Sequence, residues 1–165
     1  MSQLIREGAV LVDEWSTLDE EAPLPPAGKV IVPWQRWEAT TDTSQSAPGL
    51  QIGVLIPNTL DIASAWRKIF DRPLLALSFP AFADGRAYSQ AALIKRRYGY
   101  KGELRAVGAA VVRDQLQQMK SCGFDTFLLR SDQDAETCAQ SFHDFSLAYQ
   151  PHVGGDIKRL RPGRP

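Results

Sequence analysis

Cysteine and histidine are scarce in this sequence, which limits the metal and redox chemistry that its side chains can support. The chain has two cysteines, Cys122 and Cys138, without CxxC spacing, and two histidines. A disulfide framework needs more cysteines than this, and an iron–sulfur cluster needs several thiolate ligands. Cys138 and His143 have no second close pair beside them, which argues against zinc. We therefore expect no metal site and no bound cofactor.

Neither sign of charge is in excess, and long apolar runs are absent. The 19 Lys and Arg residues balance the 19 Asp and Glu residues, so net charge indicates no nucleic-acid partner. The run Lys95–Lys101 mixes basic and aromatic residues, but such a run is more typical of the solvated end of a helix. No segment has the pattern of a transmembrane helix or a signal peptide. We expect no membrane partner, no nucleic acid and a cytoplasmic location.

The 165 residues, 44% of them hydrophobic, are enough for one soluble globular domain. A glycine turn between two apolar runs indicates a β-hairpin in Leu4–Val12. Acidic residues and prolines in Asp13–Pro26 favour a surface loop. The next predicted elements are a strand at Lys29–Val32, a short helix with Trp34 and Trp37 on one face, and a polar connection from Thr40 to Gly49.

From Leu50 onward, short apolar runs alternate with helical patterns, which is typical of βα units in a parallel sheet. The four predicted strands are Gln51–Ile56, Leu74–Phe79, Glu103–Val107 and Phe124–Leu129. Each precedes a helix whose apolar residues recur at helical spacing. The expected helix signals are N-caps at Asn58 and Asp132 and a left-handed stop at Gly99.

This pattern predicts an α/β fold with a mainly parallel sheet from four βα units, flanking helices and an N-terminal β-hairpin arm. The sequence leaves open whether the sheet is open and doubly wound or a partial TIM-like barrel, closed by the N-terminal strands or by a second copy. The expected divisions are an arm at 1–49 packed on the main domain, a βα-repeat core at 50–150, and a flexible basic tail at 151–165.

The loop after the second strand of this core holds the most varied group of reactive side chains. It carries Asp84, Gly85, Arg86, Tyr88 and Ser89 just before a helix begins. The C-terminal ends of parallel strands gather loops and helix N-termini at one edge, so an anion there would meet Arg86 and backbone N–H groups. The structural alternative is a turn with an N-cap and a salt bridge between Asp84 and Arg86.

Arg113 and Asp114 follow the next strand and would lie in the first turn of its helix, near the same edge as Arg86. Two arginines that converge there favour a small oxyanion or a carboxylate. The alternative is again structural, because the helix dipole favours an acidic residue in a first turn. The sequence therefore predicts a small-anion site at this edge, with the structural interpretation open beside it.

Two other possible reactive groups have weaker support. His143 beside Asp144 is more typical of a helix surface than of a catalytic pair. Cys122 precedes Gly123 at an expected helix C-terminus, where the dipole raises a thiol pKa. The chain also lacks the glycine-rich loops of dinucleotide-binding folds and NTPases.

Several segments taken together resemble a known family. They are FPAFADGRAYS at Phe79–Ser89, GELRAVG at Gly102–Gly108, RDQL at Arg113–Leu116 and CGFD at Cys122–Asp125. In combination they resemble the bacterial family of domains of unknown function numbered nine-three-four, over nearly the whole chain. Members are often described as oxidoreductases involved in sulfite reduction. The resemblance therefore implies a place in sulfur assimilation, and it supplies no catalytic residues.

Sulfite reduction is a multi-electron reaction that uses siroheme with an iron–sulfur cluster, or a flavin and a nicotinamide. The sequence contains no recognisable motif for binding these groups. We therefore expect an accessory or binding protein of assimilatory sulfite reduction. Its expected partners are sulfite reductase or its electron donor, and a small oxyanion is the expected ligand.

Two alternatives belong to other functional classes. One is a small α/β enzyme that acts on an anionic substrate, with arginines as binding groups and Asp84 or Asp114 as the acid–base group. The other is an oligomeric interaction protein, in which an exposed arm with Trp34 and Trp37 forms the interface between copies.

Overall fold

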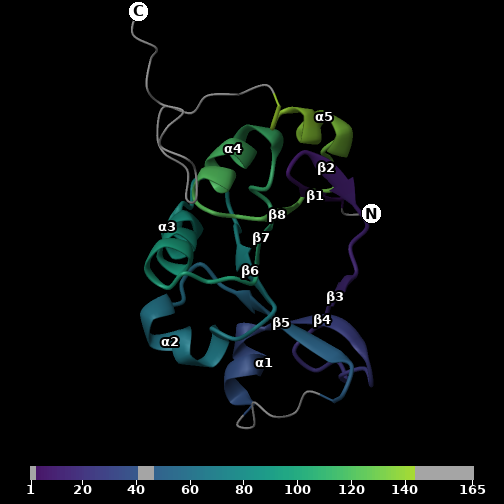
Figure 1. Ribbon diagram of the computed structural model, residues 1–165, viewed down its shortest axis with the longest axis vertical. Coiled ribbons are helices and arrows are strands. Elements are labelled where there is room, and N and C mark those ends of the chain that lie inside the picture. Colours follow the sequence, from purple (N-terminus) through teal and green to yellow (C-terminus); the bar gives the residue numbers. More distant parts are fainter. Residues whose placement is uncertain (1–2, 41–46, 144–165) are drawn as a thin grey trace, which may run out of the picture.

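The computed structural model describes residues 3–40 and 47–143, which form one curled sheet covered by helices (Figure 1). The strands are β1 (Leu4–Arg6), β2 (Ala9–Leu11), β3 (Trp15–Thr17), β4 (Gly28–Pro33), β5 (Leu50–Ile56), β6 (Leu74–Ser78), β7 (Glu103–Val107) and β8 (Thr126–Leu128). The helices are α1 (Trp34–Ala39), α2 (Ile62–Ile69), α3 (Arg86–Ala92), its π-helical extension η1 (Leu93–Arg97), α4 (Arg113–Ser121) and α5 (Ala135–Gln140). The strand order is β2-β1-β8-β7-β6-β5-β4-β3.

Strands β3 to β8 lie side by side in sequence order and are all parallel. The exception is β1, which pairs antiparallel with both β2 and β8. Right-handed crossovers that all advance in the same direction place their helices on one face of the sheet, as Figure 1 shows. The predicted α/β fold with a mainly parallel sheet is confirmed, and β4 with α1 adds a further βα unit to the four predicted.

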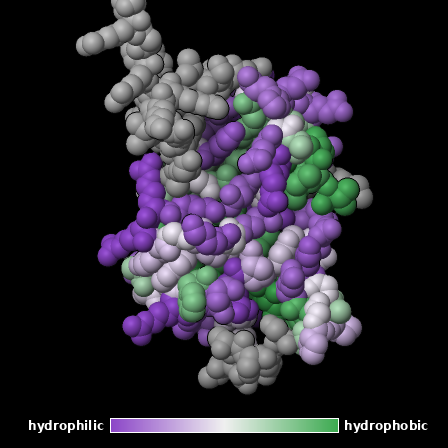
Figure 2. All heavy atoms as spheres, in the orientation of Figure 1, coloured by the Kyte–Doolittle hydropathy of each residue, from purple (hydrophilic) through white to green (hydrophobic). Residues whose placement is uncertain are grey.

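The predicted N-terminal hairpin is confirmed, and it lies at an edge of the sheet. Glu7 and Gly8 have φ angles of 49° and 82°, as in the two-residue turns whose twist suits a hairpin. Ile5 of β1 pairs with Phe127 of β8, which leaves β2 as the free edge. The exposed apolar side chains on and just after this edge strand are Val10, Leu11 and Val12. Figure 2 shows hydrophobic side chains gathered near this hairpin.

One extended segment connects the two edges of the sheet. β2 ends at Leu11 and β3 begins at Trp15, although these strands stand at opposite ends of the sheet order. A chain advancing from Leu11 to Trp15 reaches at most about 14 Å, whereas the edges of a flat sheet of this size would lie roughly 34 Å apart. The sheet must therefore curl. Of the architectures left open by the sequence, the structure has an open, strongly curled sheet, or half-barrel.

The main hydrophobic core lies between the convex face of the sheet and the helices. Alternate residues of each strand point to this face, among them Val54, Leu75 and Leu104 from three neighbouring strands. They meet Ile69 of α2 and Met119 of α4, and all these side chains are fully buried. Complete burial of such a side chain contributes about 1.5–3 kcal/mol, so this layer holds the helices to the sheet.

The concave face carries a smaller apolar cluster and a buried arginine. The cluster consists of Ile31, Leu74 and Ala76. Arg105 of β7 pairs in register with a member of this cluster, and its side chain is 1% exposed. Its Nη1 donates to both carboxylate oxygens of Asp13 at 2.9 Å, and its Nη2 donates to Glu103 Oε1 at 2.9 Å. Arg105 therefore ties the segment between β2 and β3 to the middle of the sheet.

Two expectations for the N-terminal residues are wrong. The range Asp13–Pro26 is not a loop throughout, because β3 pairs there with β4. Trp34 and Trp37 do share a short helix, but each is 6% exposed and belongs to the core. The Trp37 indole also donates to the carbonyl of Lys68 at 2.9 Å. These tryptophans therefore do not form an exposed interface between copies.

The cap of α2 differs from the prediction. Asp61 caps the helix, because its side chain accepts a hydrogen bond from the backbone N–H of Ala63. The predicted cap, Asn58, instead donates its side-chain amide to Asp84 at 2.6 Å. The helix begins later than expected because this asparagine is used to connect two loops.

The cap of α5 is displaced in a similar way. Asp134 caps this helix by accepting from the backbone N–H of Thr137 at 2.8 Å. The predicted cap, Asp132, is paired with Arg130 instead. The predicted stop after the second helix is confirmed, since Gly99 follows η1 with a φ of 62°.

The predicted division at residue 49 falls between two paired strands, since β4 and β5 are in register from Gly28–Leu50 to Pro33–Leu55. Asp144 and the predicted tail at 151–165 lie outside the described residues. Within residues 3–40 and 47–143, none of the helices combines the length and apolar composition that crossing a bilayer requires.

Replacing Arg105 with alanine is expected to lower the free energy of unfolding by about 3–5 kcal/mol, because it leaves the partly buried carboxylate of Asp13 without its cation and removes one of the two cations that pair with Glu103. Urea unfolding followed by circular dichroism measures this loss. Arg6→Ala is the matched control, because Arg6 pairs with the same Glu103 at 3.2 Å but its side chain is 45% exposed. The control should lose about 1 kcal/mol or less, and equal losses in the two variants would contradict the proposed role of Arg105.

Candidate functional site

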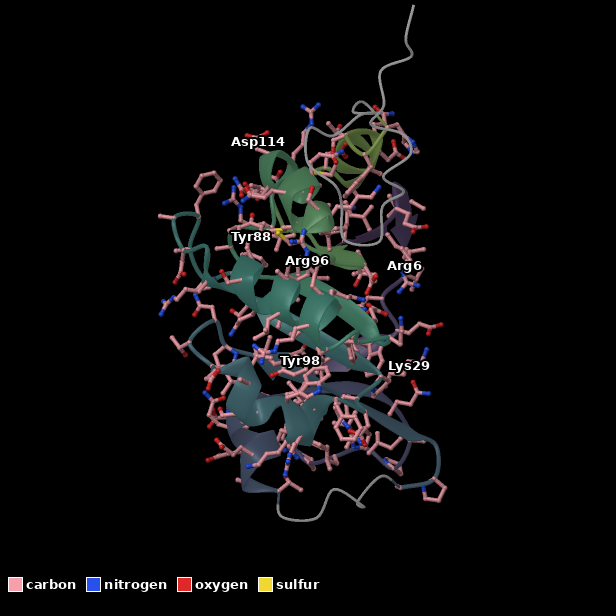
Figure 3. The ribbon with its side chains drawn as sticks, turned by 60° about the vertical axis from the view of Figure 1, so that its left-hand side comes forward. Arg6, Lys29, Tyr88, Arg96, Tyr98 and Asp114 are labelled. Carbon is pink, nitrogen blue, oxygen red and sulfur yellow. The ribbon has the colours of Figure 1, made fainter. Side chains whose placement is uncertain are left out.

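The loops after β6, β7 and β8 bring the predicted site residues to one edge of the sheet. These strands are parallel neighbours, so the range Asp84–Ser89 after β6 and the pair Arg113–Asp114 after β7 lie at their C-terminal ends. Figure 3 shows Tyr88 and Asp114 on this side and Arg6 on the opposite side of the molecule. The geometry of the sheet therefore gathers these loops as the sequence predicts.

Asp84 and Arg86 form an ion pair that is fixed from a neighbouring loop. Arg86 Nε and Nη2 donate to the Asp84 carboxylate at 2.9 and 2.6 Å. Asn58, from the loop after β5, donates to the same carboxylate at 2.6 Å. Hydrogen bonding to Arg86 holds the pKa of Asp84 well below its usual range. The Arg86 side chain itself remains 59% exposed, so its other N–H groups face solvent.

Tyr88 links α3 to α4. Its hydroxyl donates to Gln115 Oε1 at 2.6 Å, and its ring packs against Phe79 with centroids 5.0 Å apart. Burial raises the pKa of Tyr88 to about 12, so the phenol keeps its proton at neutral pH. Gly85, the residue before α3, and Ser89, within it, are both exposed.

Arg113 and Asp114 begin α4 and are both exposed, as predicted. The backbone N–H of Arg113 donates to Gln133 Oε1 at 3.2 Å, which connects the start of α4 to the loop after β8. Asp114 lies in the first helical turn, where the dipole favours a carboxylate. This placement is compatible both with the predicted small-anion site and with a structural role in the first turn of the helix.

A third arginine at the same edge, Arg130, is not among the predicted site residues. It follows β8 and donates to the Asp132 carboxylate from Nε at 2.6 Å and from Nη2 at 2.8 Å. Its Nη1 donates to the carbonyl of Ala109 in the loop after β7 at 3.2 Å. The available signal was the spacing, because an arginine and an aspartate two residues apart follow both β6 and β8. We call Arg86, Arg113 and Arg130 the arginine edge.

The backbone under the arginine edge has little room to move. Gly108 ends β7 with a φ of 118°, and a Cβ atom there would lie 2.5 Å from the carbonyl oxygen of Phe79. The Ala110 N–H also donates to this oxygen at 3.3 Å. Only glycine allows this close approach of two neighbouring loops, so the arginines stand on a well-packed support.

A cavity lies at the opposite edge, where β7 and β8 begin. Its volume is about 410 Å³, and its wall includes Arg6, Lys95, Lys101 and Lys120. In parallel sheets, ligands usually bind at the C-terminal ends of the strands, whereas this cavity lies at the N-terminal ends. The sequence signal for this cavity is the basic run Lys95–Lys101, whose pattern is also typical of the solvated end of a helix.

Neither cysteine has the environment of a reactive thiolate. Cys122 is half-buried after α4 and Cys138 is buried in α5. Burial raises the pKa of both thiols. At Cys122 the sequence predicts that the helix dipole raises the pKa, whereas burial is the main cause in the structure. No group of three or more Asp, Glu, His or Cys side chains in the described part of the chain could hold a metal ion.

The model of DUF934, a bacterial protein of unknown function, matches residues 53–158, nearly two thirds of the chain. The chain belongs to this family. In this DUF934 protein the match includes all three members of the arginine edge, whereas Arg6 and Asp13 lie before it. No curated protein matches the chain.

The pairing at the arginine edge can be tested by titration. Hydrogen bonding from Arg130 lowers the pKa of Asp132 from 3.8 to about 2. A carboxylate with a lowered pKa stabilises the fold above its ordinary pKa, and that contribution is lost as the pH falls toward the folded value. Arg130→Gln is expected to raise the pKa of Asp132 toward 3.8, as followed by NMR of the carboxyl carbon.

Arg86→Gln is the control for this titration, because it should raise the pKa of Asp84 and leave that of Asp132 unchanged. An Asp132 pKa that does not move in the Arg130→Gln variant would contradict the pairing. Sensitivity of Asp132 to both substitutions would instead indicate that the two pairs act as one unit.

Proposed function

We propose that this DUF934 protein is an accessory binding protein of assimilatory sulfite reduction, and that it contacts its partner or a small oxyanion through the arginine edge. The observation that carries the proposal is that three neighbouring parallel strands are each followed by an exposed arginine, Arg86, Arg113 and Arg130. Adjacent strands lie about 5 Å apart, so the three loops form one surface, on which the arginines stand beside Asp84, Asp114 and Asp132.

Arg86 and Arg130 are positioned before any partner arrives. Arg86 and Arg130 each use Nε and Nη2 to hold a neighbouring aspartate. A guanidinium has five N–H donors, so donors remain for a further acceptor. Because the side chains are already fixed, binding would cost less conformational entropy than binding by free arginines. This arrangement suits carboxylates on an acidic protein surface and tetrahedral oxyanions.

The link to sulfite reduction comes from the family resemblance carried by Phe79–Ser89 and the other matching segments. An accessory role is favoured over catalysis by the residues of this chain. The low pKa of Asp84 makes it a weak proton acceptor, which weakens its candidacy as a general base. With raised pKa values, the two cysteine thiols are poor ligands for an iron–sulfur cluster.

A tagged protein recovered from its native host, grown with sulfate as the only sulfur source, tests the partner. We expect sulfite reductase or its electron donor to co-purify, as identified by mass spectrometry. The variant Arg86→Ala/Arg113→Ala/Arg130→Ala should lose this partner, since all guanidinium donors of the arginine edge would be removed. The control is Arg97→Ala, which removes one exposed charge at the end of η1 and should retain the partner.

Three outcomes would count against the proposal. Retention of the partner by the triple variant would place the docking surface elsewhere. If neither the unmodified protein nor the triple variant recovers a partner, calorimetry with sulfite and sulfate tests the proposed binding of an oxyanion. Absence of binding in that measurement overturns the proposal. Reduction of sulfite by the purified protein with a defined electron donor would show an enzyme instead.

A further inference from the structure

We propose that the cavity where β7 and β8 begin binds a small organic molecule through its phosphate group. We call it the basic cavity and define it by Arg6, Lys95, Lys101 and Lys120. It lies at the opposite edge of the sheet from the arginine edge, so this inference does not depend on the function proposed above.

The basic cavity is assembled from distant parts of the chain. Arg6 comes from the end of β1, which runs against β8 and therefore ends where β8 begins. Lys95 belongs to η1 and Lys101 follows it, while Lys120 lies in the last turn of α4. Phe124 and Phe127, both nearly fully buried, also line the cavity. The wall thus combines cationic groups with apolar surface.

Two of the cations already have carboxylate partners. Arg6 pairs with Glu103 at 3.2 Å, and Lys95 pairs with Asp125 at 2.8 Å. Both carboxylates have further structural bonds, because Glu103 also holds Arg105 and Asp125 accepts the backbone N–H of Leu104 at 2.8 Å. The negative charges of Glu103 and Asp125 are therefore balanced by neighbouring cations.

The other two cations, Lys101 and Lys120, have no ion-pair partner in the described part of the chain. The described contact of Lys120 is with the ring of Phe142, 5.3 Å from the ammonium nitrogen. Glu7, at the tip of the hairpin, is the remaining carboxylate in the wall, and it opposes the binding of an anion. The charges left after pairing are thus two ammonium groups against one carboxylate.

Lys101 is held in place by the residues on either side. Tyr100 is 5% exposed, and its hydroxyl donates to the carbonyl of Arg72 at 2.7 Å. Gly102 lies so close to this ring that a Cβ atom would come within 2.2 Å of the hydroxyl oxygen. The turn therefore presents Lys101 from a fixed backbone, which lowers the entropy cost of binding.

Charge type and size together indicate the class of ligand. Unpaired lysines bind phosphate well as point charges, whereas planar carboxylates are best held by an arginine fork, and three of the four cations of this cavity are lysines. A volume of about 410 Å³ lies in the range of small-molecule sites and far exceeds an inorganic anion. We therefore expect a phosphate monoester with an organic part that occupies the remaining volume of the cavity.

Isothermal titration calorimetry of the full chain at low salt, with ribose 5-phosphate and AMP as probes, tests the proposal. At least one probe should bind the unmodified protein. Lys101→Gln and Lys120→Gln should each weaken that binding about tenfold, and the double variant should abolish it. Glu7→Gln should strengthen it about two- to threefold, because a repulsive charge is removed.

Lys68→Gln is the control, because Lys68 on α2 is also an exposed lysine and does not line the cavity. It should bind the probes like the unmodified protein. Absence of binding by both probes at about 10 mM would overturn the proposal. An equal loss in the Lys68 variant would show non-specific attraction, and citrate binding as tightly as the phosphate esters would refute the ligand class.

Discussion

The ion pair between Arg105 and Asp13 is the contact on which the shape of this molecule most depends. Arg105 points from the middle of a parallel strand into the concave face, where a charge is costly unless it is paired. Asp13 satisfies it from the short segment between β2 and β3. Glu103 completes the site and also accepts a hydrogen bond from Thr126 at 2.6 Å. One buried guanidinium thus holds the segment that joins the two edges against the middle of the sheet.

Much of the fold could be predicted because it is encoded locally. In β5 to β8, apolar strands are followed by helices with a single apolar stripe, and this repeat is visible without any partner. β3 could not be predicted in the same way, because Trp15–Thr17 is short, lies among acidic and proline residues, and becomes a strand only by pairing with β4. The charge of Arg105 at a core position of a strand was a signal that its partner would come from elsewhere.

The arginine edge could also be predicted only in part, because some of its features follow from the local sequence and others from contacts between distant residues. Topology alone placed the loops of Asp84 and Arg113 together. The contacts that shape them, such as Asn58 with Asp84, join loops that the sequence separates. The cavity at the other edge could not be predicted, because its residues are distant in the sequence. Lys95 and Lys101 line a cavity only because β1 and α4 bring Arg6 and Lys120 beside them.

The pairing of β1 with β8 has a consequence for how the protein is made. Ile5 leaves the ribosome long before its partner Phe127, which is among the last of the described residues. The hairpin must therefore wait for almost the whole domain to be synthesised, and contacts so distant in sequence slow folding. During that interval β1 lacks its pairing with β8, and an unpaired sheet edge of this kind exposes the nascent chain to aggregation until β8 emerges.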